Sequence, residues 1–264
     1  MSRNIMSITA FLDAFTPLTI LAAAVFMMAG GFVKGAVGFA LPLVAVSGIS
    51  SIASPQEAIA AIIIPAFVAN IWQAGRQGIG PAIETAKEHW KLNLTLALTI
   101  GIVAQAVPYM PTRMFFILLG VIVSLVALIQ LVGVVLPTPK TKAQRTGFEI
   151  LMGFFAGAMG GFGGFWGPAT VMYLVALKTE KQQMIRAQGL TYLVGSLMLV
   201  GGHSASGVLN AATLPLSAMM LLPAAIGMFL GTKLQDRLDP IAFKRLVLIV
   251  LCVAGLNLLR RGIF

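Results

Sequence analysis

Residues 30–42 read GGFVKGAVGFALP and residues 157–168 read GAMGGFGGFWGP. Both contain the pattern G-x3-G-x2-G-F-x2-P, and each position of the second copy lies 126 residues after its equivalent, as Pro168 does after Pro42. This regularity predicts that the chain is a duplication of one unit. Each copy lies in an apolar stretch, where glycine and proline interrupt a helix and free backbone groups that lipid cannot satisfy. We therefore expect each interruption to face protein, water or a bound molecule.

The composition is typical of a membrane protein. Of the 264 residues, 58% are hydrophobic and 10% are charged, and the mean hydropathy is +0.95, which leaves too little polar surface for a soluble domain of this size. The formal net charge is +10, but the basic residues lie in short clusters between apolar runs, as in membrane proteins whose loops set their orientation. This distribution argues against a nucleic-acid partner and makes the lipid bilayer the expected environment.

Six apolar runs have the length of ordinary membrane spans: 57–73, 92–109, 113–136, 184–201, 212–232 and 241–259. The two stretches that contain the motif, 17–50 and 147–177, are over thirty residues long, or roughly 45 Å of straight helix. Each is therefore either one broken crossing or a pair of half-helices that enters the membrane and returns.

The positions of Lys and Arg help to decide between these alternatives. If both motif stretches return, the loops on one face hold thirteen basic residues and those on the other hold four, whereas two full crossings give nine against eight. A strong excess is expected on the cytoplasmic face. If only the second stretch returns, the split is fourteen against three, so charge does not decide the path of the first stretch. The duplication argues that both behave alike.

We therefore predict an all-α polytopic membrane protein with two inverted repeats, each made of a broken, re-entrant Gly-Pro motif helix and three transmembrane helices. The first repeat covers residues 1–136, a basic cytoplasmic linker covers 137–146, and the second repeat covers 147–264. Three crossings per repeat would invert the second repeat, so that the motif hairpins meet near the midplane. Paired interruptions of this kind are typical of the binding site of a secondary transporter.

The motif glycines allow two interpretations. The G-x3-G spacing is typical of helices that pack closely in lipid. The second copy, however, contains the additional Gly160, Gly163 and Gly167, which favours an unwound loop because glycine destabilises a helix. Pro42 and Pro168 would then lie in the first turn of a new helix, where proline is favoured. A helix that begins inside the membrane offers free N–H groups and a partial positive charge to an anion.

Lys34 lies within the first motif, in a run from Pro17 to Pro55 that is otherwise uncharged. A cation at that depth is costly without a partner or water, so a functional role is expected, although its side chain could also extend to an interface. The second copy has Gly160 at this position, so an anion would be held asymmetrically.

Polar residues in the spans after the motifs, among them Asn70, Gln73 and Tyr192, either face the site or join helices by hydrogen bonds. Trp166 either closes over a ligand or anchors the packing. The predicted substrate-binding residues are Lys34, Gly35, Gly38, Phe39, Pro42, Asn70, Gly161, Gly164, Phe165, Trp166, Pro168, Gln188 and Thr191.

No motif for catalysis, a metal or a cofactor is evident, so we expect neither an enzyme nor a cofactor-binding protein. His89 lies in a segment expected to be a charged loop, His203 in a segment expected to be a short loop, and Cys252 is the single cysteine. Neither histidine has a second ligand at suitable spacing, and there is no phosphate-binding Walker loop.

The segments 30–42, 157–168 and 227–240 (GMFLGTKLQDRLDP) resemble the TauE/SafE family of membrane transporters, and the resemblance covers nearly the whole chain. It implies a multi-pass carrier in the bacterial inner membrane, whose partners are small sulfur-containing anions such as sulfite, sulfoacetate or other sulfonates. It also implies export as the direction of transport, which the residues themselves leave open. The excess of Lys and Arg predicts, independently of the resemblance, that the basic loops lie in the cytoplasm.

The alternatives are an anion channel on the same scaffold, uptake of a non-sulfur organic anion, and a membrane protein that transports nothing. No acidic residue lies deep in a predicted span, so a proton relay through carboxylates is not visible. The sequence leaves the coupling ion open, and it does not distinguish a monomer from a homodimer.

Overall fold

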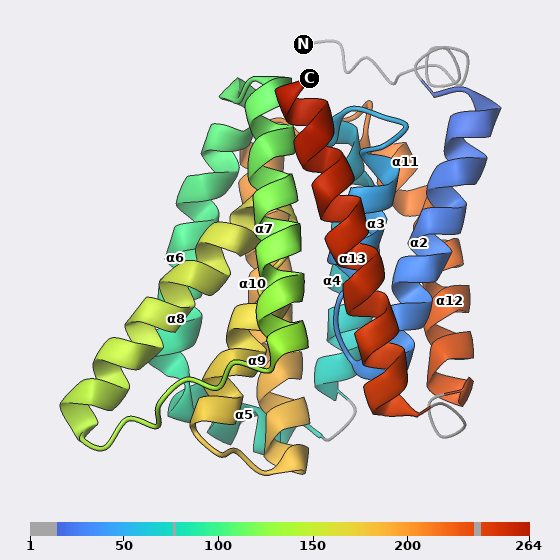
Figure 1. Ribbon diagram of the computed structural model, residues 1–264. Helices are drawn as coiled ribbons and strands as arrows, with labels where there is room; N and C mark the ends of the chain where they lie inside the picture. The colour runs from blue at the N-terminus through green and yellow to red at the C-terminus, as the bar shows by residue number, and fades with distance from the viewer. Residues whose placement is uncertain (1–14, 76–77, 235–238) are drawn as a thin grey trace.

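In the computed structural model, residues 15–75, 78–234 and 239–264 are described. They form a helical bundle and contain no strand (Figure 1). The helices are α2 (Pro17–Val37), α3 (Leu41–Ile49), α4 (Pro55–Gly75), α5 (Ile79–Glu88), α6 (Trp90–Ala106), the short 3-10 helix η1 (Val107–Tyr109), α7 (Thr112–Val132), α8 (Lys142–Gly163), α9 (Gly167–Ala176), α10 (Lys181–Ala205), α11 (Leu214–Met219), α12 (Leu221–Leu234) and α13 (Pro240–Ile263).

Seven described segments are long and apolar enough to cross a membrane: Pro17–Val37, Pro55–Gly75, Trp90–Tyr109, Thr112–Val132, Gln182–Ala205, Leu214–Leu234 and Arg245–Ile263. The chain is therefore an all-α, multi-pass membrane protein, as its composition predicts.

Each motif stretch forms a helical hairpin (Figure 1). Helix α2 runs from the upper end of the bundle into its interior, and α3 returns toward that end. Helix α8 starts at the lower end, and α9 returns to it. The two stretches thus enter the bundle from opposite ends, so neither is a simple broken crossing.

Local sequence determines where the hairpins turn. Helix α2 ends at Gly38, with φ of 87°, and α8 ends at Gly164, with φ of 80°. Glycine adopts this left-handed conformation without a steric penalty. Pro42 and Pro168 lie in the first turns of α3 and α9, as predicted.

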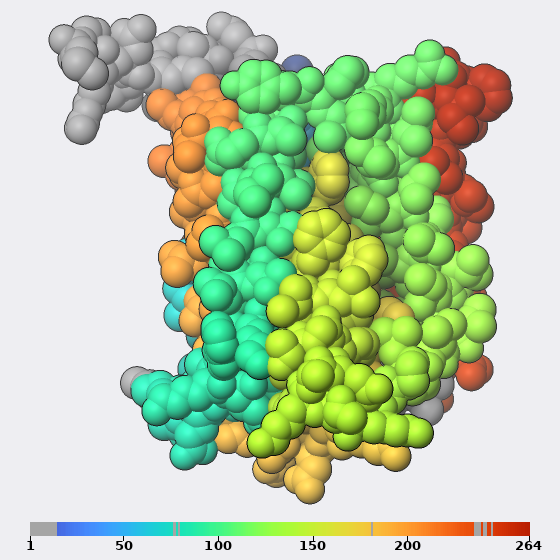
Figure 2. All heavy atoms as spheres, turned by 90° about the vertical axis from the view of Figure 1, so that its left-hand side faces the viewer, coloured from blue at the N-terminus to red at the C-terminus, as the bar shows by residue number. Residues whose placement is uncertain are grey.

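The prediction of an unwound loop through Gly160 and Gly163 is wrong, because α8 remains helical to Gly163 and only residues 164–166 separate it from α9. The glycines form a contact face instead. A Cβ atom built on Gly157 would lie 2.6 Å from the Thr99 Cβ and 2.7 Å from the Leu96 carbonyl oxygen of α6. Figure 2 shows α6 and α8 side by side along one face of the molecule. Close backbone approach of this kind stabilises the packing of helices in lipid.

An equivalent contact joins α2 to α12. A Cβ atom on Gly31 would lie 3.1 Å from the Ala224 Cα, and one on Gly35 would lie 2.9 Å from the Thr232 nitrogen. The G-x3-G pairs of both motifs therefore lie at helix contacts, which agrees with the packing interpretation of that spacing.

Helix α4 continues through Pro65, which has no N–H to donate to the Ala61 carbonyl. Ser217 of α11 compensates for the missing donor. Its hydroxyl donates to the Ala61 oxygen at 3.5 Å and accepts from the Ile64 N–H at 3.1 Å. Helix α4 thus continues as an α-helix after Pro65, through Asn70.

Three other predictions differ from the structure in their details. The charged segment before His89 is the helix α5 rather than a loop. The linker predicted over 137–146 overlaps α8, which begins at Lys142 with a capping box between Thr141 and Gln144. The span predicted over 113–136 ends at Val132, because Gly133 adopts φ of 71° and terminates the helix.

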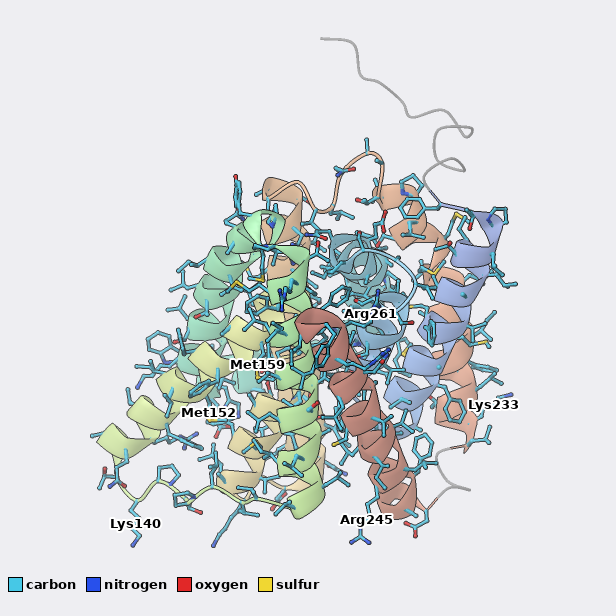
Figure 3. The ribbon with its side chains drawn as sticks, turned by 45° about the horizontal axis from the view of Figure 1, so that its top comes forward. Lys140, Met152, Met159, Lys233, Arg245 and Arg261 are labelled. Atoms are coloured by element: carbon cyan, nitrogen blue, oxygen red, sulfur yellow. The ribbon has the colours of Figure 1, made fainter. Side chains whose placement is uncertain are left out.

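Basic side chains gather at one end of the bundle. Figure 3 shows Lys140 and Arg245 at this lower end, and Arg261 toward the other. Arg113, at the start of α7, also lies at the upper end, where α6 leads into α7 (Figure 1). Arg3, Arg76 and Arg237, which contributed to the predicted charge asymmetry, lie outside the described residues.

Candidate functional site

The turns of the two motif hairpins contact each other. A Cβ atom built on Gly164 would lie 3.2 Å from the Pro42 Cβ and Cγ, and one on Gly167 would lie 3.5 Å from the Phe39 Cβ. Residues that are far apart in the sequence thus form one site, which contains the first turns of both α3 and α9.

A small cavity lies where the turns meet. It is lined from the first hairpin by Lys34, Phe39, Ala40, Leu41, Pro42 and Leu43, from the second by Gly164, Phe165, Trp166, Gly167 and Pro168, and from α4 and α10 by Ala66, Asn70 and Tyr192. Its volume is about 20 Å³, which is room for about one water molecule. The site is therefore closed around a space smaller than a sulfonate.

Lys34 is the charged group of this cavity, and only 6% of its surface is exposed. Its Nζ donates to the Asn70 Oδ1 and to the Gln73 Oε1, both at 2.7 Å, and lies 5.4 Å from the centroid of the Tyr192 ring. All three partners are neutral. The ion pairs among the described residues involve Glu88 and Glu149 and none includes Lys34, so its positive charge has no carboxylate beside it.

The two amides that hold Lys34 are themselves fixed. The Asn70 Nδ2 donates to the Tyr192 carbonyl of α10 at 3.0 Å, and the Gln73 Nε2 donates to the Gly38 carbonyl at 3.4 Å. These bonds direct both amide oxygens toward the ammonium group. Helix α4 therefore connects the first hairpin to α10 through one polar network in apolar surroundings.

Helices α3 and α9 begin at the cavity without side-chain caps. Ala40 and Trp166 are their N-cap residues, and neither accepts a hydrogen bond through its side chain. The N–H groups of a first helical turn have no partner within the helix, and they carry a partial positive charge. Two such ends and one ammonium group therefore converge on the same small space, an arrangement that suits an anion.

Most of the predicted site residues line this cavity: Lys34, Phe39, Pro42, Asn70, Gly164, Phe165, Trp166 and Pro168. Gly38 and Gln188 lie next to it, since a Cβ atom on Gly38 would be 3.9 Å from the Gln188 Oε1. Gly35 and Gly161 lie instead at the contacts with α12 and α6. Thr191 is buried in α10 and is not among the lining residues.

Two residues outside the predicted set complete the site, namely Gln73 and Tyr192. Helical spacing could have identified both, because Gln73 follows Asn70 by three positions and Tyr192 follows Gln188 by four, so each shares a helix face with a predicted residue. From the sequence, however, the polar groups of both residues fitted ordinary hydrogen bonds between helices equally well.

His203 is placed differently from the sequence prediction. It lies in the last turn of α10, fully buried, and its Nε2 is 3.1 Å from the Gly161 carbonyl oxygen. Because a carbonyl can only accept, His203 donates from Nε2, and its Nδ1 has no partner among the described groups. Gly161 is in the last turn of α8, where carbonyls lack helical donors, so His203 secures the end of this helix.

A second polar cluster lies at the end of the bundle that carries the linker. Arg145 bonds Glu88 at 3.0 Å and Glu149 at 3.1 Å, Glu149 accepts from the Tyr173 hydroxyl at 3.3 Å, and the Tyr173 oxygen is 2.9 Å from the His89 Nδ1. Burial lowers the pKa of His89, while Glu88 opposes that shift. The cluster attaches α9 to α8, to α5 and to His89, the residue between α5 and α6. Glu149, almost fully buried near the start of α8, was overlooked in the sequence.

Within the described ranges, no group of three or more His, Cys, Asp or Glu side chains could hold a metal ion. The residues that line the cavity offer hydrogen-bond donors and one positive charge rather than the ligands of a metal ion.

Comparison with curated proteins gave no match, and comparison with solved structures gave none either. Comparison with protein families gave a match to the profile described as Sulfite exporter TauE/SafE, which covers residues 21–258 and so includes both hairpins and the cavity between them. The family is one of membrane transporters of the sulfite and sulfonate exporter type. The chain belongs to the sulfite exporter TauE/SafE family.

Proposed function

We propose that this protein is a secondary carrier that exports small sulfur-containing oxyanions, with sulfite, sulfoacetate and related sulfonates as the substrate class. The observation that carries the proposal is Lys34, a buried cation whose three neighbours are neutral. A charge inside a membrane needs a partner, and an anionic substrate would supply it. The family supports the substrate class.

In this proposal the substrate oxygens replace the amide oxygens around Lys34 and accept from the first turns of α3 and α9. Backbone N–H groups and a single ammonium group suit an oxyanion of low charge, since they donate several hydrogen bonds without introducing a high positive charge. Asn70 and Gln73 could turn their NH₂ groups toward the same oxygens, because an amide carries both donors and acceptors.

The size of the cavity favours a carrier over a channel. It has room for about one water molecule and is lined by the buried Phe39, Phe165 and Trp166. A substrate can therefore enter only if one hairpin moves relative to the rest, which is the motion that alternating access requires. A channel would need a continuous opening beside the same residues.

The helix contacts support an inverted repeat. Helix α2 packs on α12 as α8 packs on α6, and α4 contacts α11 as α10 contacts α5. Helices α4 and α10 contact each other, and so do α7 and α13. Exchanging the first half for the second leaves this set of pairs unchanged, as expected for two halves related by a two-fold axis in the membrane plane.

We propose that the Lys140 end faces the cytoplasm of a bacterial cell, with the protein in the inner membrane. The basic residues near that end support this orientation. An inside-negative potential of 100 mV favours the exit of an anion by about 2.3 kcal/mol per negative charge, so export needs no further coupling ion.

The test uses purified protein in liposomes. Labelled sulfoacetate should enter faster when unlabelled sulfoacetate is present inside, and sulfite, isethionate and taurine should compete in the order of their negative charge. Accelerated exchange identifies a carrier, whereas single-channel currents without exchange would identify a channel. Preference for a neutral compound over every anion tested would contradict the proposal.

A further inference from the structure

A groove on the membrane-facing surface lies between the first hairpin and the C-terminal helices. Its volume is about 680 Å³, within the range of about 300–1,000 Å³ that is common for ligand pockets. Its walls come from α2, α3, α12 and α13. Figure 1 shows that α2 and α13 approach each other at the lower end and diverge toward the upper end, with α3 between them.

The long part of the groove is apolar. Phe26, Phe32, Val247 and Leu251 are among the residues that line it. Along α13 the lining runs from Phe243 to Asn257, which at 1.5 Å per residue is roughly 21 Å of helix. This length exceeds half of the hydrocarbon core, whose full thickness is about 30 Å. An apolar hollow that faces hydrocarbon does not hold water, so its occupant must be largely apolar.

The upper end of the groove is polar and basic. Ser51 and Asn257 line it, and the Arg260 Nη2 donates to the Asn257 Oδ1 at 3.2 Å. Arg261 donates from Nη1 to the Ser50 carbonyl at 2.6 Å and lies 4.5 Å from the centroid of the Phe116 ring. Neither arginine forms an ion pair with a carboxylate in the described part of the chain. Two positive charges therefore stand at one end of an apolar groove.

We propose that this groove binds an anionic phospholipid of the leaflet at the upper end, with an acyl chain along α13 and the headgroup phosphate at Arg260. An occupant with one negatively charged end and a long apolar body matches the groove in both charge and length. Arg260 has unused N–H donors for a phosphate, because its only bonds in the described structure are to Asn257. The proposal does not depend on the transported substrate.

The site is connected to the transport cavity through α3. Ser47 and Gly48 of α3 line the groove, and Leu41 to Leu43 at the other end of the same short helix line the cavity. A bound acyl chain would therefore contact one of the two half-helices that begin at the transport cavity.

Native mass spectrometry of the purified full chain measures this binding directly, after exchange into detergent with equal amounts of phosphatidylglycerol and phosphatidylethanolamine. We expect the wild type to retain phosphatidylglycerol preferentially. Ala254→Trp, which fills the groove, should reduce its retention at least about tenfold, while Leu222→Trp on the surface of α12 should not. Leu222 is 69% exposed and does not line the groove.

A second variant tests the headgroup contact and does not change the packing of the groove. Arg260→Gln should lower the ratio of retained phosphatidylglycerol to phosphatidylethanolamine about fivefold, as expected for one basic residue at an anionic lipid. Arg245→Gln, at the lower end of the same helix, should leave the ratio unchanged. Equal retention of both lipids by the wild type would overturn the proposal, and so would full retention by Ala254→Trp. A change from dimer to monomer in Ala254→Trp with unaltered lipid would assign the groove to a second copy of the chain instead.

Discussion

At the scale of single residues, the site depends on a positive charge that only neutral groups surround. Asn70 tests this directly, because its Oδ1 lies 2.7 Å from the Lys34 Nζ. Asn70→Asp would place a carboxylate there and form an internal ion pair that competes with the substrate. We expect the KM for the transported anion to rise at least about tenfold relative to Asn70→Leu, which removes a hydrogen bond but leaves the charge of Lys34 free. Transport assays in liposomes compare the two variants. Equal KM values would show that the positive charge of Lys34 does not contribute to substrate binding.

His89 makes a separate prediction about pH. Burial lowers its pKa below the usual 6.5, so the folded protein binds this proton more weakly than the unfolded chain does. The stability contributed by neutral His89 is therefore present above pH 6.5 and is lost as the pH falls through the lowered pKa. Glu88, Arg145, Glu149 and the Tyr173 hydroxyl surround the ring. These groups are the same in the wild type and in a His89→Gln variant, so a comparison of the two proteins isolates the contribution of the ring.

Thermal unfolding in detergent at pH 7.5 and 5.5 provides the measurement. The wild type should lose more of its Tm on acidification than His89→Gln, which keeps a polar side chain but has no titratable ring. A similar loss in both proteins would assign the acid sensitivity to the neighbouring carboxylates.

At the scale of elements, glycine decides how closely α8 approaches α6. A Cβ atom on Gly157 would lie 2.6 Å from the Thr99 Cβ, so Gly157→Ala should destabilise the protein by about 1–3 kcal/mol through overpacking. Gly147 lies in the same helix, and a Cβ atom there would have no neighbour within 4 Å, so Gly147→Ala should be neutral or stabilise by up to about 1 kcal/mol. Tm values of the two variants check that the changes in stability have opposite signs. If both substitutions destabilise the protein, contacts between helices are not the cause of the destabilisation.

His203 makes a comparable contribution at the end of α8. His203→Leu would leave the Gly161 carbonyl without its donor and should cost about 1–3 kcal/mol of stability. His203→Gln, which can still donate, should recover part of that loss in the same unfolding assay. Equal losses in the two variants would indicate that packing of the ring, rather than its hydrogen bond, stabilises this helix end.

The elements also show what the sequence could predict. Helix breaks at Gly38 and Gly164 followed from glycine and proline, whose effects are local and independent of the surroundings. The helical state of Gly160 and Gly163 did not follow, because the contact with α6 and the membrane environment outweigh their weak helix propensity. The position of His203 was missed because the short loop was placed too early in the chain.

At the scale of the whole molecule, the repeat predicted that two distant segments meet, and Pro42 and Gly164 do so. The residues that complete the site from α4 and α10 were harder to predict. Some of their polar groups contact other helices and some line the cavity. Only the three-dimensional arrangement distinguishes Tyr192, which lines the cavity, from Thr191, which does not. Spacing along one helix cannot show which of its faces a hairpin will contact.

The proposed orientation makes a prediction for the whole molecule. In a Cys252→Ser background, Lys140→Cys should react with a membrane-impermeant thiol reagent in inverted vesicles, whose outer surface is cytoplasmic. It should not react in right-side-out vesicles. Tyr109→Cys, at the opposite end and 87% exposed, should react only in right-side-out preparations. The reverse pattern would invert the assigned topology.

The proposed transport depends above all on the binding of an oxyanion by Lys34 together with the two hairpin turns. The most direct test is calorimetric binding of sulfoacetate and sulfite to the purified wild type, to Lys34→Gln and to Lys233→Gln, the last a lysine on the surface of α12. We predict that Lys34→Gln binds at least about tenfold more weakly, since a hydrogen bond to a charged group contributes about 1.5–3 kcal/mol, and that Lys233→Gln binds as the wild type does. A folded Lys34→Gln protein with the wild-type Kd would show that Lys34 does not bind the anion.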